Sequence, residues 1–396
     1  MKLFRNFFML FLVGFDPSLS YRAFRFRSGS SSSAVRSCRL MPRMHLTSGA
    51  ADDHVISTPS LRRDTSSHKY KLDAAARIIA IGDVHGGFNE LHHALKISGC
   101  ADEEGRWTGG DTVVVQMGDF LDRGSDESRS IEMLRDLKVQ AKDAGGDVIT
   151  LLGNHEIMNA DLDFSYAPDI YSFDSWHDKF NMAEKLQTVL KGKRAQLMQR
   201  GKGKLAMLMS TMPVVVQIGD NVFVHGGLTR ETISHGIDKL NQEVADWLRK
   251  DADVKPWLLD PVPKGGRTVS PLWERVYGMP IVPEAALETL DGMLESMDAK
   301  RMIVGHTPQK YGISGVGTEK EKEVWRIDTN LNDKIMGRVE CLEILTDLES
   351  PEAASTVRVL SEDGRIIAAE KRKNMFEELL RSQNKKETAI PVPLRT

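Results

Sequence analysis

The chain has 396 residues, of which 41% are hydrophobic and 28% charged, a composition typical of a soluble globular protein with one large core and additional segments. Residues 1–50 contain eight Lys or Arg and one acid, a charge of +7 within a total of −3, which leaves −10 for the rest. An acidic body argues against general nucleic-acid binding, and the widely spaced Cys38, Cys100 and Cys341 argue against a disulfide framework or a thiolate zinc site.

The amino terminus has the features of a targeting presequence. Lys2 and Arg5 precede an apolar run, "FFMLFLVGF", and a stretch rich in Arg and Ser follows. The run is shorter than a membrane-spanning helix of about 20 residues but suits a signal-peptide core, and the stretch behind it suits a transit peptide. This order resembles the two-part plastid presequences of algae with secondary plastids. A plastid is therefore favoured over a mitochondrion, with no membrane segment in the mature form; a cytoplasmic protein with a disordered tail is the alternative.

A polar linker follows the presequence, so we expect residues 1–70 to be presequence and linker. The folded domain is expected to cover residues 73–370, and residues 371–396 to form a polar tail.

The domain begins with three strand–helix units. Their strands and loops read "ARIIAIGDVHG" (76–86), "TVVVQMGDFLDRG" (112–124) and "DVITLLGNHE" (147–156), and helical spacing of apolar residues follows. Repetition of this unit predicts a parallel sheet with functional groups at the carboxyl ends of its strands.

The second half of the domain is expected to begin with helices and to continue with strands. The helical stretch 175–208 carries a basic run from Lys191 to Lys204, for which a solvated helix face is the favoured interpretation and capture of acidic phosphopeptides the alternative. Residues 212–227 then predict a hairpin, and residues 318–323 an exposed loop between strands. Parallel units followed by hairpins predict an α/β fold of two mixed sheets packed face to face, with helices outside.

Five predicted strand ends place Asp, Asn or His beside glycine. They read "GDVHG" (82–86), "GDFLDRG" (118–124), "GNHE" (153–156), "HGG" (225–227) and "GHT" (305–307). Taken singly, each has an ordinary interpretation, such as a helix cap at Asp83 or Asn154 or a structural histidine. In this order, each after a strand, they give oxygen and imidazole donors without thiolate, which suit manganese, iron or zinc. One carboxylate can bridge two such cations about 3.5–4 Å apart for a displacement at phosphorus.

The motif set resembles that of the calcineurin-like metallophosphoesterases, and within them the Shewanella-like branch of the phosphoprotein phosphatases, over about residues 77–370. The resemblance implies a metallophosphoesterase sandwich of two mixed sheets and a metal-dependent phosphatase acting on phosphoproteins. It implies two divalent cations, with manganese favoured over iron or zinc. A hydroxide between the cations would attack phosphorus directly, without a covalent phosphoenzyme.

The resemblance also implies roles for individual residues. The metal ligands would be Asp83 and His85 for the first cation, Asp119 as the bridge, and Asn154, His225 and His306 for the second. Among the catalytic residues, His155 would protonate the leaving oxygen and Asp122 would orient its ring. Arg123 would bind the phosphate oxygens, with Arg275 as the second arginine.

Two departures from related phosphatases restrict these inferences. The "SAPNYC" motif of common Ser/Thr phosphatases is absent, which favours the Shewanella-like branch and leaves Ser/Thr or Tyr preference open. The branch usually has Asp, a small residue and Gly where this chain has Asp328-Thr329-Asn330, which leaves the geometry of that loop open. A dinucleoside polyphosphate hydrolase and a non-catalytic scaffold are the alternative functions, and the sequence does not indicate an oligomeric state.

Overall fold

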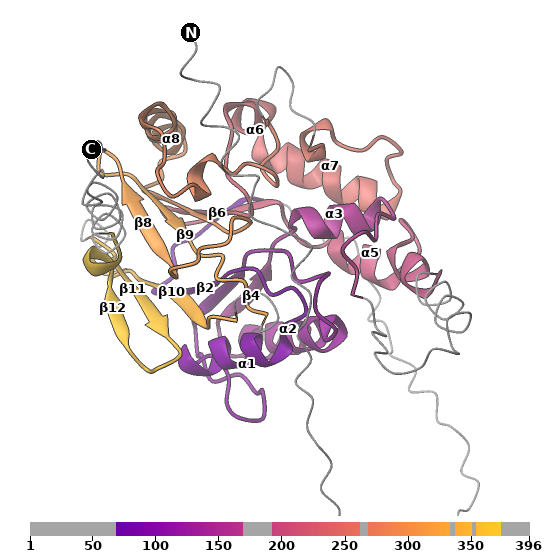
Figure 1. Cartoon of the computed structure of the whole chain (residues 1–396), viewed down its shortest axis with the longest axis horizontal. Coiled ribbons are helices and arrows are strands. Elements are labelled where there is room, and N and C mark those ends of the chain that lie inside the picture. Colours follow the sequence, from indigo (N-terminus) through magenta and orange to yellow (C-terminus); the bar gives the residue numbers. More distant parts are fainter. Residues whose placement is uncertain (1–68, 169–191, 262–267, 333–336, 351–353, 374–396) are drawn as a thin grey trace, which may run out of the picture. The chain divides into compact units, whose positions relative to one another are not determined.

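The computed structural model describes residues 69–168, 192–261, 268–332, 337–350 and 354–373 (Figure 1). The chain divides into two units, Met1–Leu61 and Arg62–Thr396, and all described residues belong to the second. The predicted presequence and most of the predicted polar tail lie outside the described residues, so these expectations stay predictions. Among the described residues, no helix combines the length and the apolar character needed to cross a bilayer.

One six-stranded sheet contains the three strand–helix units. Across the sheet its strands are β12 (Ile366–Ala368), β11 (Thr356–Ser361), β10 (Glu340–Leu345), β2 (Arg77–Ile81), β3 (Val113–Gln116) and β4 (Asp147–Thr150). The strands β2, β3 and β4 are parallel, whereas β10 pairs antiparallel with both β2 and β11. The parallel order predicted for the first half of the domain is confirmed.

The second sheet also has six strands. Their order is β1 (Lys71–Leu72), β5 (Val215–Ile218), β6 (Asn221–Val224), β7 (Arg301–Val304), β9 (Glu323–Arg326) and β8 (Ser314–Gly317). The predicted hairpin is present as β5 and β6, and Gly219 in its turn has a φ of 58°. Parallel pairing of β6 with β7 and of β7 with β9 gives this sheet its own row of parallel strand ends.

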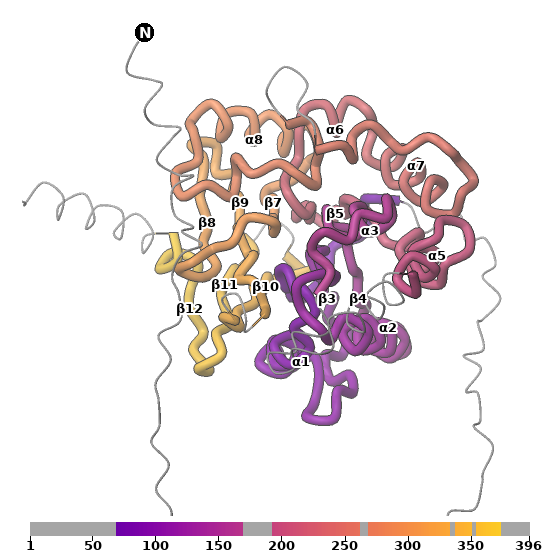
Figure 2. The backbone as a smooth tube through the Cα atoms, turned by 45° about the vertical axis from the view of Figure 1, so that its right-hand side comes forward, coloured from indigo at the N-terminus to yellow at the C-terminus, as the bar shows by residue number. Residues whose placement is uncertain are grey.

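Helices cover the outer faces of the two sheets. Those of the first half are α1 (Phe88–Ile97), α2 (Glu127–Asp143) and α3 (Asn154–Ala160), and those of the second half are α5 (Lys204–Met209), α6 (Arg230–His235), α7 (Ile237–Arg249) and α8 (Glu284–Ser296). Figure 2 shows the strands between α1 and α2 on one side and α6, α7 and α8 on the other. The predicted α/β fold of two mixed sheets with helices outside is confirmed.

Alternation of side chains along the strands builds two apolar layers. Ile78 and Ala80 of β2 pack in the cluster between the sheets, with Phe223 of β6 and Trp325 of β9. Their neighbour Ile79 faces the other way, into the larger cluster beneath the helices. Successive strand residues point to opposite faces, so each buried strand contributes to both layers. The two packed layers fix the positions of the strand ends.

The core between the sheets is expected to be sensitive to truncation. Phe223→Ala removes a fully buried ring and should lower the free energy of unfolding by about 3–5 kcal/mol. Urea denaturation measures this change. The control Val254→Ala truncates a side chain that is 83% exposed and should change the value by less than about 0.5 kcal/mol. Equal effects of the two substitutions would contradict the packing between the sheets.

Candidate active site

The polar motifs meet where the parallel strands of both sheets end. One sheet supplies the segments after β2, β3 and β4, and the other supplies those after β6 and β7. The backbone N–H of His306 donates to both carboxylate oxygens of Asp83, at 3.1 and 3.2 Å, although the two residues are 223 positions apart. The N-cap residues of α1 and α3 are Gly87 and Gly153, so the helix-cap alternatives for Asp83 and Asn154 are wrong.

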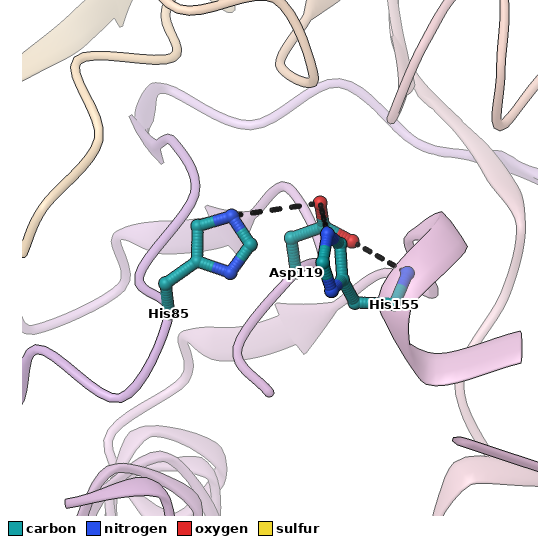
Figure 3. A group of neighbouring side chains, drawn as sticks. All are labelled: His85, Asp119 and His155. Carbon is teal, nitrogen blue, oxygen red and sulfur yellow. Dashed lines mark hydrogen bonds and ion pairs between the residues drawn. The ribbon is translucent and has the colours of Figure 1, made fainter. Parts of the chain in front are cut away.

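Asp119 lies at the centre of the site. Its Oδ2 is 3.2 Å from Nε2 of His225, 3.8 Å from Nε2 of His85 and 3.9 Å from Nε2 of His155, and Figure 3 shows the last two rings beside the carboxylate. Potential metal-binding atoms of His85, Asp119 and His155 lie within 4.8 Å of one another, and so do those of Asp119, His225 and His306. One carboxylate therefore belongs to two neighbouring groups of donors.

Backbone carbonyls fix the orientation of two of these imidazoles. Nδ1 of His85 lies 2.9 Å from the carbonyl oxygen of Leu121, and Nδ1 of His225 lies 2.8 Å from that of Met117. A carbonyl oxygen only accepts hydrogen bonds, so each Nδ1 carries the hydrogen and each Nε2 faces Asp119. Metal-binding histidines are commonly held in this way by their second nitrogen.

Burial and mutual charge set the pKa values of the group. Burial lowers the pKa of His306 to about 2 and that of His85 to about 4, so both rings are neutral. Burial also lowers the pKa of His225, but the carboxylates of Asp119 and Asp83 outweigh this effect and raise it to about 10. Burial raises the pKa of Asp83, and the neighbouring carboxylates raise it further. The site therefore gathers buried carboxylates, two neutral imidazoles and the protonated ring of His225.

These properties fit divalent cations. Asp83 and Asp119 are 1% and 2% exposed, a burial that is costly for a carboxylate unless positive charge compensates it. Nε2 of His306 is buried and finds no hydrogen-bond partner among the described residues, as expected of an atom whose lone pair binds a metal. Oδ1 of Asn154 lies 3.0 Å from Nε2 of His225, which brings the amide into the same group. All six residues predicted as metal ligands are thus gathered, with oxygen and nitrogen donors alone.

His155 and Asp122 form a buried pair beside Asp119. Nδ1 of His155 lies 2.6 Å from Oδ2 of Asp122. Asn159, one turn further along α3, donates its amide to both oxygens of Asp122 at 3.0 Å. Burial lowers the pKa of His155, but Asp119 and Asp122 outweigh it and raise the pKa above its usual value. The pair has the contact that a proton donor and its orienting carboxylate require.

Both predicted arginines lie at the edge of the site. Arg123 is exposed, and its guanidinium carbon lies 5.7 Å from the centre of the Tyr166 ring, which packs edge-on against His155. Nη1 of Arg275 donates to the carbonyl oxygen of His306 at 2.8 Å. Tyr166 was not predicted as a site residue, because no motif or periodicity marks it in the sequence. It is 51% exposed, which leaves an aromatic ring at the mouth of the site.

Unusual backbone conformations position the site residues. Five of them are non-glycine residues with left-handed φ angles: His85 (46°), Asp119 (51°), Asp122 (69°), Arg123 (65°) and His306 (63°). Such conformations are unfavourable unless surrounding contacts hold them. Glu156 supplies such contacts, because Oε2 accepts the backbone N–H groups of Asp119 and Gly153 at 2.7 and 2.8 Å and Oε1 accepts that of Leu121 at 3.1 Å. Although Glu156 stands inside the "GNHE" motif, its support of the Asp119 loop was not predicted.

The loop at Asp328-Thr329-Asn330 adopts a glycine-like turn. Asn330 has a φ of 54°, and asparagine tolerates this region better than most other non-glycine residues. Its backbone N–H donates to Oδ1 of Asp328 at 2.9 Å, and the N–H of Leu331 donates to the carbonyl oxygen of Asp83 at 2.9 Å. The substitution of asparagine for glycine is thus compatible with a loop that contacts the Asp83 segment.

Within the basic run from Lys191 to Lys204, Arg194 points inward, toward the predicted site. The lysines of this run that the structure describes are exposed, as predicted. The side chain of Arg194 is only 16% exposed, and its Nη2 donates to Oδ1 of Asp122 at 2.7 Å. The predicted solvated face is therefore wrong for Arg194. The sequence could not indicate this, because the contact with Asp122 joins segments that are distant along the chain.

The whole constellation lies within residues 76–310, which match the family model of the calcineurin-like phosphoesterases. The match covers more than half of the chain and contains all ten predicted site residues. The chain is a calcineurin-like phosphoesterase.

Comparison with similar proteins assigns this phosphoesterase to a branch of the family. Shewanella-like protein phosphatase 2 of Arabidopsis thaliana is 33% identical over 78% of this chain and 87% of its own length, and Shewanella-like protein phosphatase 1 of Plasmodium berghei is 26% identical over 69% and 75%. This phosphoesterase belongs to the Shewanella-like protein phosphatases. The crystal structure of a mutant cold-active protein tyrosine phosphatase matches with a TM-score of 0.59 and 25% identity over 77% of this chain and 84% of the other.

Glu156 is expected to be important for the stability of the phosphoesterase. Glu156→Gln replaces one acceptor oxygen with an amide that faces backbone N–H groups, so at least one buried donor loses its partner. The free energy of unfolding should fall by about 2–3 kcal/mol in urea denaturation. Glu288→Gln, at an exposed position of α8, should change it by less than about 0.5 kcal/mol. A Glu156→Gln variant as stable as this control would show that the three hydrogen bonds do not support the loop.

Proposed function

We propose that this phosphoesterase removes phosphate groups from phosphoproteins, by direct hydrolysis with two divalent cations. The observation that carries the proposal is the position of Asp119, whose carboxylate lies beside the rings of His85 and His225 and next to the His155–Asp122 pair. The names of its relatives, which are protein phosphatases, support a phosphoprotein as the substrate.

The six gathered donors would divide between two cations, with the carboxylate of Asp119 shared by both. The ligands would be Asp83, His85 and Asp119 for one cation, and Asp119, Asn154, His225 and His306 for the other. When bound, the cations would make a water molecule more acidic and stabilise negative charge on the phosphoryl group. Manganese, iron and zinc all suit oxygen and imidazole donors, and manganese is our first choice.

The side chains beside this centre would complete the reaction. His155 would donate a proton from Nε2 to the leaving oxygen, because Asp122 occupies Nδ1 and so directs the other nitrogen outward. Arg123 and Arg275 would bind phosphate oxygens through charge-assisted hydrogen bonds. Proton donation of this kind typically contributes about 10²–10⁴-fold to a rate, and it matters most when the leaving oxygen is strongly basic.

Tyr166 supports phosphotyrosine as a substrate. Its exposed ring lies beside both Arg123 and His155, where an aromatic leaving group would pack against it. The solved structure that matches at 25% identity is that of a protein tyrosine phosphatase, which agrees with this assignment.

Manganese-dependent phosphate release from peptides tests the proposed activity. The full chain should hydrolyse a phosphotyrosine peptide faster than matched phosphoserine and phosphothreonine peptides, and a chelator should abolish turnover. Asp119→Asn should lower kcat at least ~100-fold, because it weakens the donor shared by both cations. The matched control is Asp136→Asn, at an exposed aspartate of α2, which should keep full activity.

The same assay separates the alternative functions. Diadenosine tetraphosphate cleavage without peptide turnover would replace the proposal with dinucleoside polyphosphate hydrolysis. A chain that neither binds manganese, iron or zinc nor releases phosphate would instead be a non-catalytic scaffold.

Metal uptake is expected to release protons. The pKa of His225 is raised to about 10, so its ring holds a second proton between pH 7 and 9, and a cation must displace that proton. The apparent affinity for Mn²⁺ should rise with pH, by about tenfold per unit for one displaced proton. Titration calorimetry in buffers with different ionisation enthalpies measures both quantities. An affinity that is constant from pH 7 to 9 would contradict a protonated His225.

A further inference from the structure

Arg194 contacts Asp122, and the reaction proposed above gives this arginine no role. We infer that Arg194 is a positioning residue, which holds the side chain of Asp122 in place and thereby orients the ring of His155 toward the leaving oxygen. This inference rests on the proposed function, because it assigns Arg194 a role in the proton transfer proposed there.

Arg194 makes hydrogen bonds in three directions. Nη2 donates to Oδ1 of Asp122 at 2.7 Å, and Nε donates to Oδ1 of Asn159 at 2.6 Å. Toward Glu127, Nη1 donates to Oε2 at 2.6 Å and Nη2 to Oε1 at 3.0 Å. A planar guanidinium suits this geometry, because its donors point in fixed directions within one plane.

Asp122 depends on this arginine for permanent charge compensation. Its side chain is 0% exposed, and among the described residues its hydrogen-bonding side chains are His155, Asn159 and Arg194. His155 is positive only while it holds the proton that it would donate, and the amide of Asn159 is neutral. Arg194 stays charged throughout, so it compensates the buried carboxylate both before and after proton transfer.

Asn159 and Glu127 extend the effect of Arg194. Oδ1 of Asn159 accepts from Nε of Arg194, so the amide nitrogen of Asn159 is directed toward Asp122. Glu127 at the start of α2 accepts both the backbone N–H of Asp122 and the guanidinium. Asp122 is thereby held through its backbone and both carboxylate oxygens, which restricts the direction of the His155 ring. A residue that acts in this way affects the rate through proton donation rather than through phosphate binding.

The leaving group separates such a role from a general structural one. Phenyl phosphate releases a phenol as weakly acidic as tyrosine, with a pKa of about 10, and so requires a proton donor. The phenol released from 4-nitrophenyl phosphate is far more acidic and requires the donor much less. Loss of positioning should therefore slow the first substrate much more than the second, with little change in KM.

The test measures kcat and KM of the full, manganese-loaded chain with both substrates. Arg194→Met should lower kcat about 10–100-fold for phenyl phosphate, the range typical of residues that orient a ligand or catalytic group, and change it little for 4-nitrophenyl phosphate. Arg194→Lys retains the charge without the planar fork and should recover part of the loss. Arg200→Met is the matched control, because it removes an arginine of the same segment whose guanidinium packs over Trp247, 4.7 Å from the ring centre.

A His155→Asn variant separates failure of the inference from failure of the proposed function. His155→Asn should show the same dependence on the leaving group, and adding Arg194→Met to it should cost nothing further. Leaving-group dependence in His155→Asn but equal losses for both substrates in Arg194→Met would overturn the inference alone. No leaving-group dependence in His155→Asn would overturn the proposed proton donor, and the inference with it. If Arg194→Met does not fold, the same comparison with Arg194→Lys decides.

Discussion

The carboxylate of Asp119 stands at the junction of two packed sheets, 2% exposed to water. Isolated, such a charge would strongly destabilise the fold, so the surrounding structure must supply either protons or cations. The pKa of His225 is raised to about 10, so its protonated ring supplies part of this compensation, and divalent cations would supply more. The same compensation explains why a stable fold can contain a site with several buried acids.

A second group of largely buried charges extends from His155 to Glu127 at the start of α2. Asp122, Arg194 and Glu127 alternate in sign, and His155 lies at the end nearest Asp119. This group and the charges around Asp119 meet at His155, whose Nε2 is 3.9 Å from Oδ2 of Asp119. In this metal-dependent phosphatase, largely buried charge is thus arranged in two groups, one around Asp119 and one around Asp122.

The sequence predicted the parts of the site that depend on strand ends, and not those that depend on helix packing. Apolar strand residues followed by glycine and a polar residue were sufficient to locate Asp83, Asp119 and His306. Asn159 stands four residues after His155, a spacing that indicates a shared helix face, but this spacing alone does not predict the contact of Asn159 with Asp122. The inward direction of Arg194 and the place of Tyr166 depend on how distant segments pack, for which the sequence has no comparable signal.

The hydrogen bond from His306 to Asp83 joins segments separated by 223 residues, and this distance has a consequence for how the protein matures. Closing so long a loop costs entropy that is recovered only when both sheets have formed and docked. The proposed cation site would thus be one of the later features to form as the chain folds. Metal occupancy in vivo would then report completed folding, and partly folded molecules would have no hydrolytic activity.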